Sequence, residues 1–193
     1  MPRVKLFDEQ EVLEKAMNLF WKQGYSATSI QDLVNHLGIN RASIYDTFGD
    51  KEELFLQAFQ NYRRINKDGI SRFLERESDV KSGLQKLFKA AIEEAISDQD
   101  RKGCFVVNTT TELIPGDGQI AKMIEENQKA FESVFLDYLE EGDKAGQFSS
   151  GKDLRAIATL LFTLYNGIKV VSKVSNDQEA LMKSVDQVLT LLD

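Results

Sequence analysis

The segment 40–48 combines hydrogen-bonding side chains with two apolar ones, Ile44 and Phe48, at helical spacing. If Ile44 and Phe48 are buried on one side of a short helix, the polar side chains face outward. Those side chains are Arg41, Ser43, Asp46 and Thr47. Their donors and acceptors suit base edges and phosphates, and the free N–H groups at the helix start near Asn40 suit a phosphate as well. The segment therefore has the chemistry of a nucleic-acid contact.

Two short helices are predicted to position this segment. The first should begin at Thr28 as its N-cap and stop at Gly38, and the second should begin at Asn40 and end at Gly49. Two short helices joined by such a turn form a helix-turn-helix, whose second helix enters the major groove of DNA. From the spacing alone, a helical bundle with well-capped short helices is an alternative.

Helical periodicity continues along the chain, and no convincing alternating strand interrupts it. A helix over 8–25 precedes the short ones, and Asp50 with Glu53 opens another after them. Longer helices are expected over 80–97, 120–141, 154–174 and 178–192. The segment Cys104–Val107 fits either a strand or a buried helix start, and 114–118 is a turn.

The change from short to long helices divides the chain. We predict an all-α protein with a helix-turn-helix domain at 1–51 and a second helical domain at 52–193.

The 193 residues include 24 Lys or Arg and 31 Asp or Glu, a net charge of −7, which speaks against a nucleic-acid binder. Residues 1–51 hold six of these cations and seven of these anions, so most of the acidity lies in the second domain. Contact with DNA would then depend on a few placed cations.

Catalytic and metal sites find little support. One His and one Cys exclude sites that need several imidazoles or a disulfide framework. Gly116, Gly118 and Ala121 fit a dinucleotide G-x-G-x-x-A pattern, but no strand is predicted before them. We expect no enzyme activity, no cofactor and no metal.

The chain also lacks a clear membrane signal. Its start turns polar before a signal-peptide core could develop, and the most apolar stretch, 157–171, is interrupted by Thr159, Thr163, Asn166 and Lys169. It falls short of the roughly 20 apolar residues of a spanning helix. We expect a cytoplasmic protein that does not enter a membrane.

Two segments resemble the DNA-binding signature of the TetR family of bacterial transcriptional regulators. They are Gly24-Tyr25-Ser26-Ala27-Thr28-Ser29-Ile30-Gln31-Asp32-Leu33 and Gly38-Ile39-Asn40-Arg41-Ala42-Ser43-Ile44-Tyr45-Asp46-Thr47-Phe48-Gly49-Asp50-Lys51-Glu52. The resemblance covers Asp8 to about Phe59, and beyond that only the architecture of long helices is similar. It implies a homodimeric regulator, expected to be a repressor that a small-molecule effector releases from double-stranded operator DNA. The second domain would bind the effector and hold the dimer together.

The resemblance implies which residues contact DNA. They are Thr28, Asn40, Arg41, Ser43, Tyr45, Thr47 and Lys51. Thr28, Tyr45 and Lys51 would bind phosphates, whereas Asn40, Arg41 and Ser43 would face bases or adjacent phosphates. Thr47 stands where the family often has His, and Asp46 is an unusual acid on a DNA face, so the operator sequence stays open.

A ligand pocket and a dimer interface are expected in the second domain. The pocket candidates, suggested mainly by the resemblance, are Phe88, Cys104, Phe105, Asn108, Thr111, Phe135, Tyr138 and Tyr165. The last two helices carry more apolar surface than one subunit needs, which predicts a four-helix interface between two copies. Its residues would be Leu160, Leu161, Leu164, Ile168, Val171, Leu181, Val185, Val188 and Leu192. Such a dimer would read half-sites about 34–36 Å apart.

Two alternatives remain. Cys104 follows Arg101 and Lys102, and nearby cations favour a reactive thiolate, so the chain could be a thiol-based redox or electrophile sensor. The segment 103–109 also resembles part of some thiol-responsive TetR-like regulators, although a free Cys is more often a small buried hydrophobe. The alternative without DNA is a helical protein-interaction module.

Overall fold

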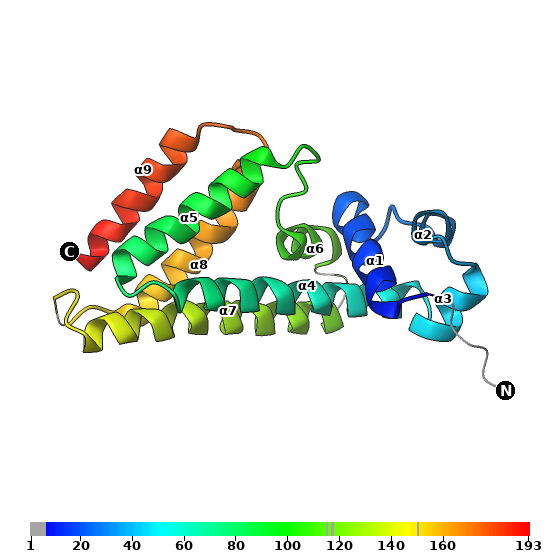
Figure 1. The fold of residues 1–193 in the computed structure, drawn as a ribbon, viewed down its shortest axis with the longest axis horizontal. Helices are drawn as coiled ribbons and strands as arrows, with labels where there is room; N and C mark the ends of the chain where they lie inside the picture. Colours follow the sequence, from blue (N-terminus) through cyan, green and yellow to red (C-terminus); the bar gives the residue numbers. More distant parts are fainter. Residues whose placement is uncertain (1–6, 115, 117, 150) are drawn as a thin grey trace.

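The computed structural model describes residues 7–114, 116, 118–149 and 151–193, and these form helices and connections without a strand (Figure 1). The helices are α1 (Glu9–Gln23), α2 (Ile30–Leu37), α3 (Arg41–Phe48), α4 (Lys51–Leu74), α5 (Val80–Ser97), α6 (Phe105–Leu113), α7 (Gly118–Lys144), α8 (Leu154–Val171), α9 (Gln178–Leu189) and the 3-10 helix η1 (Thr190–Leu192). The predicted all-α class is confirmed.

Side-chain caps determine where the first helices begin. The Asp8 carboxylate accepts hydrogen bonds from two N–H groups of the first turn of α1, and Asn40 accepts one from the Ser43 N–H at 2.8 Å. Asp50 and Glu53 form a reciprocal capping box at the start of α4. Because each cap satisfies N–H groups that have no partner inside the helix, these starts could be predicted from sequence.

The cap of α2 differs from the prediction. Ser29 is the N-cap, and it exchanges hydrogen bonds with Asp32 in a capping box. Thr28 lies one residue too early, because its hydroxyl instead donates to the Gly24 carbonyl at 2.6 Å. The assignment of Thr28 as the cap was therefore wrong.

Other differences concern the second half. Cys104–Val107, ambiguous in the sequence, is the beginning of α6, with Cys104 as its N-cap residue. α8 ends at Val171, three residues earlier than predicted, and α9 passes into η1 at Thr190. Part of the predicted turn at 114–118, Pro115 and Asp117, lies outside the described residues.

The apolar core consists of two clusters, and α4 belongs to both. The first cluster unites α1, α2 and α3 with Leu54–Phe59 of α4, Cys104–Val106 at the start of α6 and Ile120 of α7. The second unites α5, α7, α8 and α9 with Ile70 and Leu74 at the far end of α4. Figure 1 shows α4 and α7 side by side, with α1–α3 at one end and α5, α8 and α9 at the other. The predicted boundary at residue 51 therefore does not coincide with a gap in the packing.

α8 has the length and mean hydropathy (1.3 over its 18 residues) of a helix that could cross a membrane. These two properties are weak evidence, because core helices of soluble proteins meet the same criteria. Its inward residues, among them Leu161, Tyr165 and Ile168, belong to the second apolar cluster.

Candidate nucleic-acid interface and the cavity beside it

α3 has the two-sided character that the sequence predicts. Ile44 is completely buried and Phe48 nearly so, and both belong to the first apolar cluster. Arg41, Tyr45 and Asp46 are exposed. α3 follows α2 through Gly38, whose φ of +70° is the left-handed conformation that ends the helix without strain for Gly. The pair α2–α3 thus presents a short helix with a polar outer face.

Arg41 and Tyr45 form a pair on that outer face. They are four residues apart, so their side chains meet on one side of the helix. The Arg41 guanidinium lies 5.5 Å from the Tyr45 ring centroid, and its Nη2 is 3.4 Å from the Tyr45 hydroxyl. The Tyr45 side chain is still 41% exposed. Both can therefore reach a phosphate or a base edge.

The N-terminus of α3 is already partly capped. Because the Asn40 oxygen accepts from the Ser43 N–H, that N–H is occupied, and the Asn40 side-chain NH₂ remains available to meet DNA. Ser43 and Thr47 are half-buried at the sides of the helix. Their contacts with DNA stay predictions.

Thr28 does not fit its predicted role as a phosphate ligand. The residue is 1% exposed, its hydroxyl donates to the Gly24 carbonyl, and its N–H donates to the Tyr25 carbonyl at 3.3 Å. In this conformation neither group faces solvent. Thr28 instead stabilises the turn between α1 and α2, and the expectation of a phosphate contact is corrected accordingly.

Lys51 also has structural partners. Its ammonium donates to the carbonyls of Tyr25 and Thr28, both at 3.0 Å, and lies 4.1 Å from the centroid of the Tyr25 ring. The cation thereby joins the first turn of α4 to the α1–α2 turn. One ammonium N–H is left for a phosphate, so the predicted DNA contact would be shared with this structural role.

α6 contacts the same turn from the other side. The Glu112 carboxylate accepts hydrogen bonds from the N–H groups of Tyr25 (3.1 Å) and Ser26 (2.7 Å). Gly24 comes so close that a Cβ at this residue would lie 2.8 Å from the same carboxylate. The helix-turn-helix is thus held by Lys51 of α4 and by Glu112 of α6.

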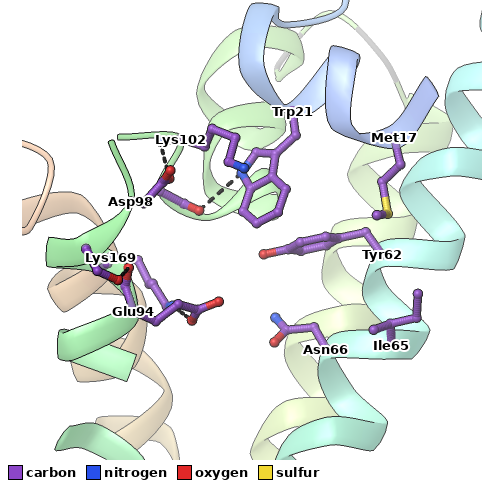
Figure 2. Close-up of a pocket in the computed structure, with 12 residues that line it drawn as sticks. Met17, Trp21, Tyr62, Ile65, Asn66, Glu94, Asp98, Lys102 and Lys169 are labelled. Atoms are coloured by element: carbon purple, nitrogen blue, oxygen red, sulfur yellow. Dashed lines mark hydrogen bonds and ion pairs between the residues drawn. The ribbon is translucent and has the colours of Figure 1, made fainter. Parts of the chain in front are cut away.

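A cavity of about 460 Å³ lies between the helix-turn-helix end and the second cluster. Figure 2 shows Trp21 and Met17 of α1 and Tyr62 and Asn66 of α4 facing it, opposite Glu94 and Lys169 of α5 and α8. The indole N–H of Trp21 donates to the Gly103 carbonyl at 3.1 Å, and the Lys102 ammonium lies 4.7 Å from the indole. The volume is that of a small-molecule site.

The predicted pocket residues lie elsewhere. Phe88 and Phe135 are completely buried in the second cluster, and the Tyr138 hydroxyl donates to the Glu77 carbonyl at 2.9 Å. Tyr165, 6% exposed, packs in the same cluster. These four residues form core, and none of them lines the cavity.

The remaining pocket candidates come from around α6. Cys104 and Phe105 are buried in the first cluster, where the Phe105 ring lies 5.4 Å from that of Phe59. The Asn108 amide donates to the Lys102 carbonyl, and Thr111 is exposed with its hydroxyl bound to backbone carbonyls of its own helix. None of these four residues lines the cavity either. Aromatic spacing is typical of core and pocket alike, and a ligand contact by these residues stays a prediction.

Tyr62 lies between the cavity and Cys104. Its hydroxyl is 3.9 Å from the Cys104 sulfur. Burial, followed by the neighbouring Cys104, raises the pKa of Tyr62 well above its ordinary value of 10.0, so the hydroxyl is a protonated donor at neutral pH. Cys104 itself is 5% exposed, which leaves little surface for an electrophile to attack.

The predicted dimer residues fall into two sets. Leu161, Ile168, Val185 and Leu192 are at most 3% exposed inside one subunit, so they cannot supply interface area and this part of the prediction is corrected. Leu160 (39% exposed) and Val171 (43%) do face outward, whereas Leu164, Leu181 and Val188 are half-buried. The outward stripe of α8 also includes Val170 and continues to Val174 beyond its end, neither of which was predicted.

Comparisons with known proteins agree with this architecture. Residues 12–58 match the family "Bacterial regulatory proteins, tetR family", and residues 81–188 match "Tetracyclin repressor-like, C-terminal domain". The chain is 34% identical over 195 residues to the uncharacterized HTH-type transcriptional regulator YezE of Bacillus subtilis (strain 168), with both chains covered completely. It is 32% identical to the HTH-type transcriptional repressor ComR of Escherichia coli (strain K12), over 98% of this chain and 90% of ComR.

Solved structures show the same fold. The regulator CifR, as a cysteine mutant bound to 26-bp double-strand operator DNA, superposes with a TM-score of 0.87 at 24% identity, covering 99% of this chain and 100% of CifR. FadR of Bacillus subtilis, in complex with stearoyl-CoA, gives a TM-score of 0.72 at 19% identity over 96% of this chain and 97% of FadR.

Proposed function

We propose that this chain, which belongs to the TetR family of bacterial regulatory proteins, is a homodimeric repressor that a small-molecule effector releases from a pseudo-palindromic operator. As a member of that family it is a transcriptional regulator with a helix-turn-helix that binds operator DNA, and not an enzyme. Repression, dimer formation, release by an effector and a cytoplasmic location are the parts we propose.

The outer face of α3 carries the proposal. Arg41 and Tyr45 are exposed together on a helix whose apolar residues, Ile44 and Phe48, are fixed in the core. An α-helix of this kind fits the major groove, where Arg can bind a guanine edge and Tyr a phosphate. Because residues 1–51 are not basic overall, binding should favour a cognate operator over bulk DNA.

The exposed stripe of α8 supports a dimer. Leu160, Val170, Val171 and Val174 are between 39% and 84% exposed in one subunit. An apolar stripe of this kind on a soluble protein is usually covered by a partner. A second copy would bury it and place two α3 helices for two half-sites.

Release would use α4, because α4 follows α3 directly and has residues in both apolar clusters. An effector bound in the second half would favour an α4 orientation in which the two α3 helices no longer match the half-sites. Such a population shift requires only that the effector bind this orientation more tightly.

A gel-shift assay with the DNA upstream of the protein's own gene tests the proposal. We expect a salt-sensitive complex that a matched unrelated duplex does not form. A Y45F protein should bind the operator less tightly, and a K122Q protein, altered at an exposed residue of α7, serves as its control. Equal binding to both duplexes, or none to either, would contradict operator recognition.

A further inference from the structure

The cavity between α1 and the second cluster is lined by residues of the helix-turn-helix end and by residues of the second half of the chain. Trp21 comes from α1 of the helix-turn-helix, Tyr62 and Asn66 from α4, and Lys102 from the connection between α5 and α6. A molecule bound there would touch the DNA-reading unit directly. None of the residues predicted from sequence as pocket residues lies on these walls.

The apolar walls suit a flat ring. The Trp21 and Tyr62 rings meet edge to face with centroids 4.9 Å apart, and Met17 and Ile65 extend the same wall. Figure 2 shows these four side chains on neighbouring turns of α1 and α4. A volume of about 460 Å³ accommodates one aromatic ring with a short chain.

Three polar side chains of the cavity can donate hydrogen bonds to a ligand: those of Lys102, Tyr62 and Asn66. The Lys102 ammonium contacts the Trp21 ring and forms no ion pair within the described part of the chain. The Tyr62 hydroxyl has the weakly accepting Cys104 sulfur as its partner. The Asn66 side chain makes no hydrogen bond among the described residues, and in Figure 2 its amide points into the cavity.

The carboxylates of the cavity are already engaged. Glu94 pairs with the nearly buried ammonium of Lys169 at 2.7 Å. Asp98 accepts hydrogen bonds from the N–H groups of Asp100 and Lys102, which close the α5–α6 connection. A cationic ligand would have to displace Lys169 or compete with these bonds, whereas an anionic ligand gains Lys102 without breaking an ion pair.

We propose that this cavity is the effector site and that it takes a small aromatic carboxylate, with its ring on Trp21 and Tyr62 and its carboxylate on Lys102 and Asn66. The inference rests on the proposed function for its regulatory part, because release of DNA requires a DNA-binding protein. The binding part is independent of that function.

The cavity is connected to α1 by two contacts. Trp21 donates to the Gly103 carbonyl, and Lys22 pairs with Asp100 at 2.7 Å, so the α5–α6 connection is tied to the last turn of α1. A ring inserted beside Trp21 pushes α1 away from α5, and the helix-turn-helix moves with α1. Binding of the effector therefore opposes the arrangement that fits the operator.

Trp21 is the sole tryptophan of the chain, so its fluorescence reports on the cavity. The purified protein is titrated with 3-phenylpropanoate, 3-phenylpropanol and 3-phenylpropylamine, which share the ring and the chain length and differ in charge. We expect the carboxylate to change the fluorescence and to bind at least roughly tenfold more tightly than the alcohol and the amine, as a charge-assisted hydrogen bond implies. Equal affinity for all three, tighter binding of the amine, or no binding overturns the site.

Variants locate the binding. In K102Q the Kd for 3-phenylpropanoate, measured by calorimetry, should rise roughly tenfold while that for the alcohol stays nearly constant. K122Q removes an exposed lysine of α7 outside the cavity and should change neither Kd. N66L, which keeps the side-chain volume, should weaken carboxylate binding independently of Lys102. An unchanged Kd in both K102Q and N66L overturns the proposed orientation.

Operator binding is measured in parallel on the same proteins. Addition of 3-phenylpropanoate should weaken the DNA complex of the unaltered protein and of K122Q, but much less that of K102Q. Ligand binding without weakening of the complex overturns the regulatory part of the inference alone. Failure to bind DNA without any ligand contradicts the proposed function and leaves the calorimetric result as it stands.

Discussion

The carboxylate of Glu112 in α6 accepts a 2.7 Å hydrogen bond from the backbone N–H of Ser26 in the α1–α2 turn, 86 residues away in the sequence. The Tyr25 N–H donates to the same carboxylate. The turn that precedes the reading helices is therefore held by a side chain from the second half of the chain, and its position follows that of α6.

We expect E112A to lower the free energy of unfolding by about 1 kcal/mol and to weaken operator binding, because two backbone donors lose their acceptor. Urea unfolding and gel shifts measure the two effects. E125A removes an exposed carboxylate of α7 that pairs with Lys129, and it should change both the unfolding free energy and operator binding by much less. Equal effects of E112A and E125A would show that the contact does not position the turn.

Lys51 should affect both stability and DNA binding. K51M loses the two carbonyl contacts at the α1–α2 turn, so the melting temperature should fall. If the third ammonium N–H also contacts a phosphate, the slope of log K against log salt falls by about 0.9. An altered melting temperature with an unchanged slope would assign Lys51 to the turn alone.

Tyr45 and Arg41 should differ in how their loss affects specificity. Y45F removes a hydroxyl expected on a phosphate and should weaken binding to every operator variant alike, whereas R41A should relax the preference at one base pair by about 1–3 kcal/mol. Binding to a panel of single-base operator variants separates the two patterns. If R41A weakened binding to all operator variants equally, Arg41 would be assigned to the DNA phosphate backbone as well.

The outward stripe of α8 should control assembly. L160E and V171E place charges on the exposed apolar surface and should convert a dimer to monomers in sedimentation experiments without unfolding the subunit. K122E, at an exposed residue of α7 outside this stripe, should leave the dimer intact. L161E, by contrast, buries a charge in the core and should unfold the chain.

Stability should decrease at alkaline pH, partly through Tyr138. Burial raises the pKa of Tyr138 from 10.0 to about 12, so the unfolded chain loses this proton before the folded one. The stabilisation is complete below pH 10.0 and is lost as the pH rises to about 12. Y138F should be less stable than the unaltered protein at neutral pH, because the Glu77 carbonyl loses its donor, and the difference in unfolding free energy should shrink across this window.

The sequence was informative wherever a signal is local. The caps at Asp8, Asn40 and Asp50 and the buried face of α3 follow from residues within one or two turns, and the structure confirms them. The cap at Ser29 was missed because two adjacent residues carry a hydroxyl, and the hydrogen bond of Thr28 to Gly24 decides between them.

Contacts between residues that are far apart in the sequence could not be predicted from local patterns. Which side of α8 faces inward depends on its packing against α5 and α7. Because α8 is apolar on most sides, periodicity does not distinguish the buried Leu161 from the exposed Leu160. Trp21 and Tyr62, in different helices, meet only after folding. No local pattern marks such a pair as part of a cavity.

Phe105 has a consequence for anyone who builds hybrid regulators. Its ring contacts those of Trp21, Phe55, Phe59 and Tyr62. A residue from the second half of the chain therefore completes the apolar cluster that supports the helix-turn-helix. A graft that exchanges residues 1–51 between two parents would pair this ring with foreign neighbours. To transfer DNA specificity, a hybrid must therefore take the start of α4 and the segment 104–106 from the same parent as residues 1–51, although the gene encodes these segments apart.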